Sequence, residues 1–82
     1  MAPETTLHIV DVFLAGGGRI VVDVDATLQA HDCVEPETTL EALNFVRRIL
    51  LEERHVITVD GWPARVSLFV AIVWRGPKRR EA

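Results

Sequence analysis

The most informative segment of this chain is residues 7–26, LHIVDVFLAGGGRIVVDVDA. Its two halves, 7–14 and 19–26, are rich in β-branched and aromatic residues, which is typical of β-strands. Between them Ala15 precedes three consecutive glycines, and glycine adopts the positive φ angles that tight hairpin turns require. The segment therefore predicts an antiparallel β-hairpin.

The register of this hairpin determines which side chains share a face, and the sequence leaves two registers open. A loop of residues 16–18 places the even-numbered residues of both strands on one almost wholly apolar face. It also sets Asp11 across from Asp23 on the other face, where a like-charge pair costs stability. A two-residue turn instead separates these acids and pairs His8 with Asp25. We favour the first register because its apolar face is better suited to contact a helix.

Residues 39–53 have the pattern of an amphipathic helix. Thr38 is a suitable N-cap, and Glu41 three residues later completes a capping box. Apolar side chains recur at spacings of three and four, as one face of a helix requires; they are Leu40, Leu43, Val46, Ile49 and Leu50. The polar segment 27–36 is expected to be a loop that holds at most a short strand.

Two further strands are predicted after the helix, at residues 55–60 and 65–74, with a turn at 61–64. The element order is then ββαββ. This order predicts an α+β fold in which one helix packs on one face of a mostly antiparallel, four-stranded sheet. Gly76 and Pro77 are expected to end the last strand.

Length and composition limit the chain to one small globular domain. Its 82 residues are 49% hydrophobic and 26% charged, which excludes a disordered chain, a collagen-like chain and a multidomain enzyme. We expect residues 1–75 to form a single domain and 76–82 a disordered basic tail. The one cysteine, Cys33, excludes an intrachain disulfide, and no signal peptide or membrane-spanning helix is recognisable. A cytoplasmic location is therefore expected.

The last predicted strand is apolar on both of its faces, whereas a half-solvated strand alternates apolar with polar residues. One helix covers only one face, so another protein is expected to cover the other, unless the chain after residue 26 packs back over it. That protein is a second copy of the chain, most simply in a homodimer, or a heterologous partner. The expected contact residues are Phe13, Phe69, Ala71 and Val73, with Trp62 at the edge.

Three aspartates share the opposite face from the apolar one in the favoured register. Carboxylates on neighbouring strands suit Mg²⁺ or Mn²⁺, so Asp11, Asp23 and Asp25 are a candidate metal site, and a metal-dependent enzyme is the second hypothesis. The competing interpretation is a solvated acidic face. The run His31-Asp32-Cys33 is best explained as a polar loop, because adjacent residues rarely adopt the geometry of a nucleophile and its base. We expect neither a cofactor nor catalysis.

Charge is distributed unevenly along the chain. Residues 1–74 carry a net charge of −6 and residues 75–82 a net charge of +3. An acidic body does not attract nucleic acid, so we expect no nucleic-acid partner and no membrane partner. The third hypothesis is contact with nucleic acid through the basic tail alone, by Arg75, Lys78, Arg79 and Arg80.

Residues 33–43, CVEPETTLEAL, resemble the stretch that enters the helix of HicB-like antitoxin domains. That family has a glycine-containing hairpin, then a Cys-Val-type segment, then Thr-Leu-Glu-Glu-Ala at the start of an amphipathic helix. The matching positions here are Gly17-Gly18 and residues 39–42. The resemblance implies an oligomeric domain that binds a protein partner, and it does not imply DNA binding by this chain. The leading hypothesis is accordingly a small, non-enzymatic, oligomeric module that binds a protein partner.

Overall fold

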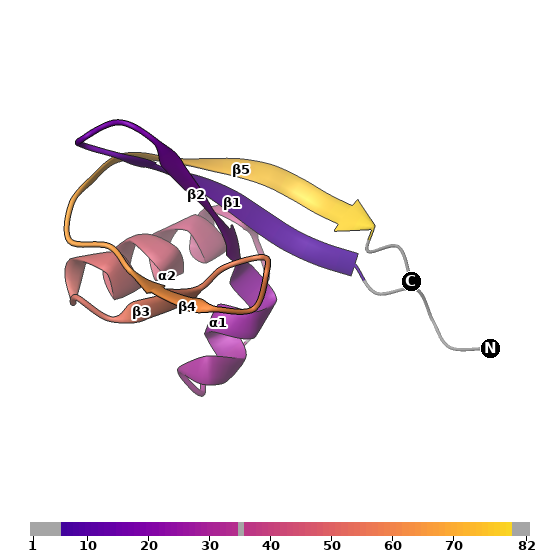
Figure 1. Cartoon of the computed structure of the whole chain (residues 1–82). Helices are drawn as coiled ribbons and strands as arrows, with labels where there is room; N and C mark the ends of the chain where they lie inside the picture. Colours follow the sequence, from indigo (N-terminus) through magenta and orange to yellow (C-terminus); the bar gives the residue numbers. More distant parts are fainter. Residues whose placement is uncertain (1–5, 35, 80–82) are drawn as a thin grey trace.

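The computed structural model describes residues 6–34 and 36–79 (Figure 1). The fold is α+β with antiparallel strands, as predicted, but it has two helices and two sheets among the described residues. The single four-stranded sheet with one helix is therefore corrected to a three-stranded sheet of order β2-β1-β5 and a separate β3-β4 hairpin. The elements are β1 (Thr6–Leu14), β2 (Arg19–Asp23), α1 (Val24–Ala30), α2 (Thr39–Leu51), β3 (His55–Ile57), β4 (Pro63–Arg65) and β5 (Phe69–Arg79).

The core lies on one side of the three-stranded sheet. Figure 1 shows both helices and the β3-β4 hairpin on this side. The buried valines of β1 and β2 pack there against the apolar face of α2; the largest of these fully buried side chains are Val10, Val12, Val22, Val46 and Ile49. The other side of the sheet carries no helix within the described part of the chain, and we call it the open face.

The β1-β2 hairpin has the face assignment of the favoured register but a different loop. Val10 lies opposite Val22 and Asp11 opposite Val21, so the even-numbered residues of both strands face the helices. The Leu14 N–H donates to the carbonyl of Gly18 at 3.1 Å, which makes residues 15–17 the loop. The partners are thereby shifted by two residues, and the expected pairing of Asp11 with Asp23 does not occur. The like-charge cost of that pairing is avoided.

Helix α1 (Val24–Ala30) replaces the predicted end of the second strand and the first four residues of the predicted loop. Asp23 is its N-cap, and its side chain accepts a hydrogen bond from the Ala26 N–H at 3.0 Å. Val24, Thr27 and Leu28 are buried at spacings of three and four. The Thr27 hydroxyl donates to the Asp23 carbonyl at 2.7 Å and accepts from the Ile57 N–H at 2.9 Å. This residue therefore joins α1 to β3.

The predicted last strand is divided in two. Its first residue belongs to β4, which pairs with β3, and β5 begins only at Phe69. A bridge between Val22 and Thr58 connects the small hairpin to β2. At its other end β5 continues past Gly76 and Pro77 to Arg79, so the predicted end of the strand is corrected.

Strand β5 is interrupted by two β-bulges where its register with β1 shifts. One extra residue, Val70, lies between the partners of Phe13 and Leu14, and a second irregularity accompanies Gly76, whose φ is +71°. A bulge changes the face to which the following residues point. As a result Phe69 packs against the core together with Ile72 and Trp74. The prediction of Phe69 on the open face is corrected accordingly.

Candidate functional site

The open face of the sheet carries a buried acid between two arginines. The Asp11 Oδ2 atom accepts a hydrogen bond from Arg19 Nη1 at 3.1 Å and from Arg75 Nε at 2.6 Å. The Asp11 side chain is 4% exposed, whereas those of Arg19 and Arg75 are 55% and 44% exposed. Burial of a carboxylate is costly unless it is paired and hydrogen-bonded, and this carboxylate is both. Two guanidiniums on one carboxylate leave one excess positive charge on the open face.

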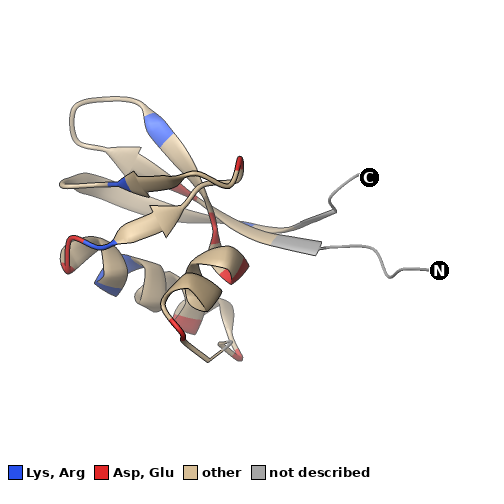
Figure 2. Ribbon diagram, turned by 60° about the horizontal axis from the view of Figure 1, so that its bottom comes forward, with Lys and Arg blue, Asp and Glu red and all other residues tan. Residues whose placement is uncertain are grey.

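Apolar side chains flank this charged group. Phe13 lies opposite Ala71, and Asp11 lies opposite Val73, so these four residues point to the same side of the sheet. Phe13 is half-buried, whereas Ala71 and Val73 are exposed. Figure 2 shows that most of the charged residues lie on the helices and loops rather than along the strands. The open face therefore combines exposed apolar surface with a local positive charge.

Trp62 does not belong to this face. It is 73% exposed and precedes β4, in a turn that is closed by a hydrogen bond from the Thr58 N–H to the Trp62 carbonyl at 3.0 Å. This hairpin contacts β2, whereas Ala71 and Val73 lie on β5 at the other edge of the sheet. Hydrogen bonds from the Thr58 hydroxyl and the Trp62 N–H lower the pKa of Asp60 in the same turn.

The structure does not bring the three candidate metal-binding aspartates together. Asp11 contacts the two arginines, Asp23 caps α1, and Asp25 contacts His8. Within residues 6–34 and 36–79, no group of three or more His, Cys, Asp or Glu side chains has an arrangement that could hold a metal ion. The predicted metal site is corrected for this reason: the shifted hairpin register and the start of α1 give each carboxylate a different environment.

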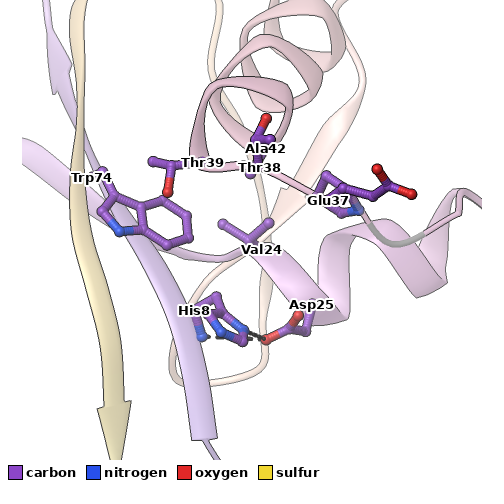
Figure 3. Close-up of a pocket in the computed structure, with 9 residues that line it drawn as sticks. His8, Val24, Asp25, Glu37, Thr38, Thr39, Ala42 and Trp74 are labelled. Carbon is purple, nitrogen blue, oxygen red and sulfur yellow. Dashed lines mark hydrogen bonds and ion pairs between the residues drawn. The ribbon is translucent and has the colours of Figure 1, made fainter.

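Sequence reasoning missed a pocket of about 170 Å³ between β1, α1 and the start of α2 (Figure 3). His8 Nδ1 lies 2.9 Å from Asp25 Oδ2, and the His8 ring stacks on Trp74 at a centroid distance of 6.0 Å. A carboxylate on one ring nitrogen orients the imidazole, as in general bases. The Thr38 hydroxyl in this pocket accepts the Glu41 N–H and so caps α2. The unfavoured hairpin register did pair His8 with Asp25, and that pairing was the available signal.

The four basic residues proposed for nucleic-acid contact have different positions. Arg75 is bound to Asp11 on the open face. The backbones of Lys78 and Arg79 continue β5 opposite β1, and Arg80 lies outside the described residues. Cys33 is half-buried, and its thiol donates to the His31 carbonyl at 3.4 Å. Of the helices in the described part of the chain, none is long and apolar enough to cross a membrane.

Comparison of the chain with protein-family models, with curated proteins and with solved structures finds no match. The resemblance of residues 33–43 to HicB-like antitoxin domains therefore stays a prediction. The geometry of the open face brings Phe13, Ala71 and Val73 together and places Phe69 and Trp62 elsewhere.

Proposed function

We propose that this chain is a non-enzymatic module that binds a protein partner through its open face. The observation that carries the proposal is the exposed apolar surface of Ala71 and Val73 beside the Arg19-Asp11-Arg75 group. Exposed apolar surface with a polar rim marks sites of interaction. Arginine is enriched in protein interfaces, because its planar guanidinium both stacks and forms several hydrogen bonds.

The charges on the open face indicate the chemistry of the partner. Each guanidinium has five N–H donors, and Asp11 uses one from Arg19 and one from Arg75. The remaining donors and the excess positive charge favour an acceptor that is itself negative. The partner is therefore a protein surface that presents a carboxylate next to apolar side chains. HicB-like antitoxin domains also act by binding a protein partner, so the resemblance of residues 33–43 agrees with this class of function.

A catalytic function has less support from the contacts in the His8 pocket. The His8-Asp25 pair could orient a base, but the Thr38 hydroxyl is engaged as the cap of α2. The metal-dependent alternative needs the three aspartates together, and they are apart. Binding of a protein on the open face needs only apolar side chains and charged groups, and the described residues supply both.

The test is capture of the partner by variants of the open face. Arg19→Gln removes one cation, and Ala71→Glu adds a negative charge among the apolar side chains. The matched control is Val34→Glu, since Val34 is 90% exposed and lies in the loop before α2. We expect proteins retained by the wild type and by Val34→Glu to be lost, at least tenfold, with both open-face variants. Equal retention by all four folded proteins, checked by circular dichroism, would exclude the open face as the contact surface.

A further inference from the structure

The two arginines of the Arg19-Asp11-Arg75 group converge on a single oxygen atom. Arg19 belongs to β2 and Arg75 to β5, and Asp11 lies between them on the central strand β1. Arg19 Nη1 donates to Asp11 Oδ2 at 3.1 Å, and Arg75 Nε donates to the same atom at 2.6 Å. The two donor nitrogens are therefore no farther apart than the sum of these distances. Two cations from opposite edges of the sheet thus lie next to each other.

Burial separates the acid from the two cations. The Asp11 side chain is 4% exposed, whereas those of Arg19 and Arg75 are 55% and 44% exposed. The carboxylate is thus buried in the sheet, and the guanidiniums that it holds are accessible to solvent. Arginine side chains lose conformational freedom when they bind a ligand. Here the buried acid restricts both side chains before any ligand binds, which lowers that cost.

Most of the hydrogen-bonding capacity of these arginines is still available. Asp11 uses one of the five N–H donors of each guanidinium. Neither arginine has another side-chain hydrogen bond to the described residues. The available donors therefore lie around one point on the open face, within reach of a single acceptor group.

The charges of this group are not balanced. Two guanidiniums surround one carboxylate, and the nearby Asp23 is engaged as the N-cap of α1, where it accepts the Ala26 N–H at 3.0 Å. The chain as a whole has a net charge of −3, so a local excess of positive charge is an exception on this protein. Neighbouring cations repel each other, and one carboxylate compensates only one of them. One further monoanion would bring the charge of the group to zero.

We propose that Arg19 and Arg75 form a clamp that binds one carboxylate group of the partner on the solvent side of Asp11. The ligand carboxylate accepts charge-assisted hydrogen bonds from both guanidiniums, whose planar donor forks match its two oxygens. Its single charge equals the excess on the group, whereas a phosphorylated side chain carries about −1.5 to −2 and would leave the group negative. The inference rests on the proposed function for the source of the carboxylate, which is a protein partner.

The apolar side chains beside the clamp restrict the rest of the ligand. Val73 lies directly opposite Asp11, and Ala71 follows on the same face. Side chains opposite each other on neighbouring strands have Cβ atoms about 4.5–5.5 Å apart. The ligand therefore carries an apolar group within one residue of its carboxylate. Two sources have this chemistry: a glutamate or aspartate beside an apolar residue, and the free end of a chain whose last residue is apolar.

The first experiment titrates the full-length protein with sodium acetate at neutral pH and constant ionic strength, and follows the Nε–H signals of Arg19 and Arg75 by NMR. We expect both signals to shift and saturate, with a millimolar dissociation constant. Arg19→Gln should weaken acetate binding at least tenfold. The matched control Arg65→Gln removes the same charge from β4 and should leave the affinity unchanged. No saturation in the wild type, or equal affinity in folded Arg19→Gln, would overturn the clamp.

The second experiment repeats the titration with other anions to test the class of ligand. Inorganic phosphate should bind no more tightly than acetate, and a phosphate affinity at least tenfold higher would overturn the choice of carboxylate. N-acetylvaline represents a chain end, and the α-amide of N-acetylglutamate represents a side chain. The tighter of these two identifies the source. The amide of N-acetylvaline lacks a carboxylate, so equal binding of it would also overturn the clamp.

These titrations contain no partner, so they distinguish the failure of this inference from the failure of the proposed function. If acetate does not bind but Ala71→Glu still abolishes capture of the partner, the clamp is wrong and the open face is still the contact surface. If acetate binds as expected but capture is unchanged in Arg19→Gln and Ala71→Glu, the proposed function is wrong and the carboxylate of a protein partner is not the ligand.

Discussion

Removing the Asp11 carboxylate and removing the Arg75 guanidinium should destabilise the fold by different amounts. Asp11→Asn leaves Arg19 and Arg75, whose side chains are 55% and 44% exposed, so water can solvate both guanidiniums. Arg75→Met leaves a carboxylate that is 4% exposed with one guanidinium at 3.1 Å. Both changes alter the same 2.6 Å hydrogen bond. We nevertheless expect Arg75→Met to destabilise the fold more, because the charge that it leaves behind is buried.

The magnitudes follow from the burial of the group that remains. Removal of one partner of a fully buried ion pair costs about 3–5 kcal/mol, because the other charge is left uncompensated. Asp11 keeps Arg19 after Arg75→Met, so the expected loss is smaller, about 2–3 kcal/mol. Asp11→Asn retains a hydrogen-bond acceptor and removes the cost of desolvating a carboxylate. We expect it to lower the free energy of unfolding by about 1 kcal/mol.

Urea unfolding followed by circular dichroism measures both values, at one fixed protein concentration because association also contributes to stability. The matched control is Arg65→Met. Arg65 lies 3.2 Å from Glu53, and the two side chains are 61% and 70% exposed, so this pair contributes about 0–1 kcal/mol. The reasoning is refuted if Arg75→Met costs no more than Arg65→Met, or less than Asp11→Asn.

Two further outcomes are expected. Thr27→Val should lower the free energy of unfolding by about 1–3 kcal/mol, because the half-buried Ile57 N–H loses its acceptor. In the same urea assay Thr27→Ser should keep most of the stability, and equal losses would exclude this hydroxyl as the cause. Thr58→Val should raise the pKa of Asp60 toward its ordinary value of 3.8 in an NMR titration. Since the folded-state pKa is lowered, the stability linked to Asp60 is present above pH 3.8 and is lost as pH falls through the folded-state pKa. An unchanged titration midpoint of Asp60 in Thr58→Val would contradict the role of Thr58.

The features that the sequence predicted correctly are those encoded by neighbouring residues. Helix α2 begins where Thr38 and Glu41 indicate, and the Glu41 N–H donates to the Thr38 hydroxyl at 3.1 Å. The glycines after Ala15 form the predicted hairpin, with Gly17 and Gly18 at positive φ. Period-two alternation in the first strand assigned its apolar face correctly, because one face of the sheet is buried.

Helix α1 was missed because two local signals compete in the segment 19–30. Val21, Val22 and Val24 extend the β-branched pattern of the strand, so propensity alone favours a longer strand. The helix signal is weaker: Asp23 as a cap, followed by apolar residues at spacings of three and four. A tertiary contact favours the helix, since in that conformation the Thr27 hydroxyl accepts a hydrogen bond from the backbone of β3.

The candidate sites depend on contacts between distant parts of the chain. Asp11 and Arg75 are 64 residues apart, so no local pattern could pair them. His8 and Asp25 are 17 apart, and of the two hairpin registers only the one that was not favoured paired them. The bulges of β5 changed the face of Phe69, and alternation counted along a regular strand does not detect such a change. The apolar side chains Ala71 and Val73 were predicted on the correct face, because they lie in the regular part of the strand.

The position of β1 in the centre of the sheet has a consequence for synthesis of the protein. Its first partner, β2, follows after a short turn, but its second partner, β5, is the last strand among the described residues. At translation rates of about 5–20 residues per second, the 55 residues from Leu14 to Phe69 take roughly 3–11 seconds to appear. During that interval one edge of β1 has no partner strand, and the nascent chain exposes this edge to chaperones. The three-stranded sheet is completed only after β5 has been synthesised.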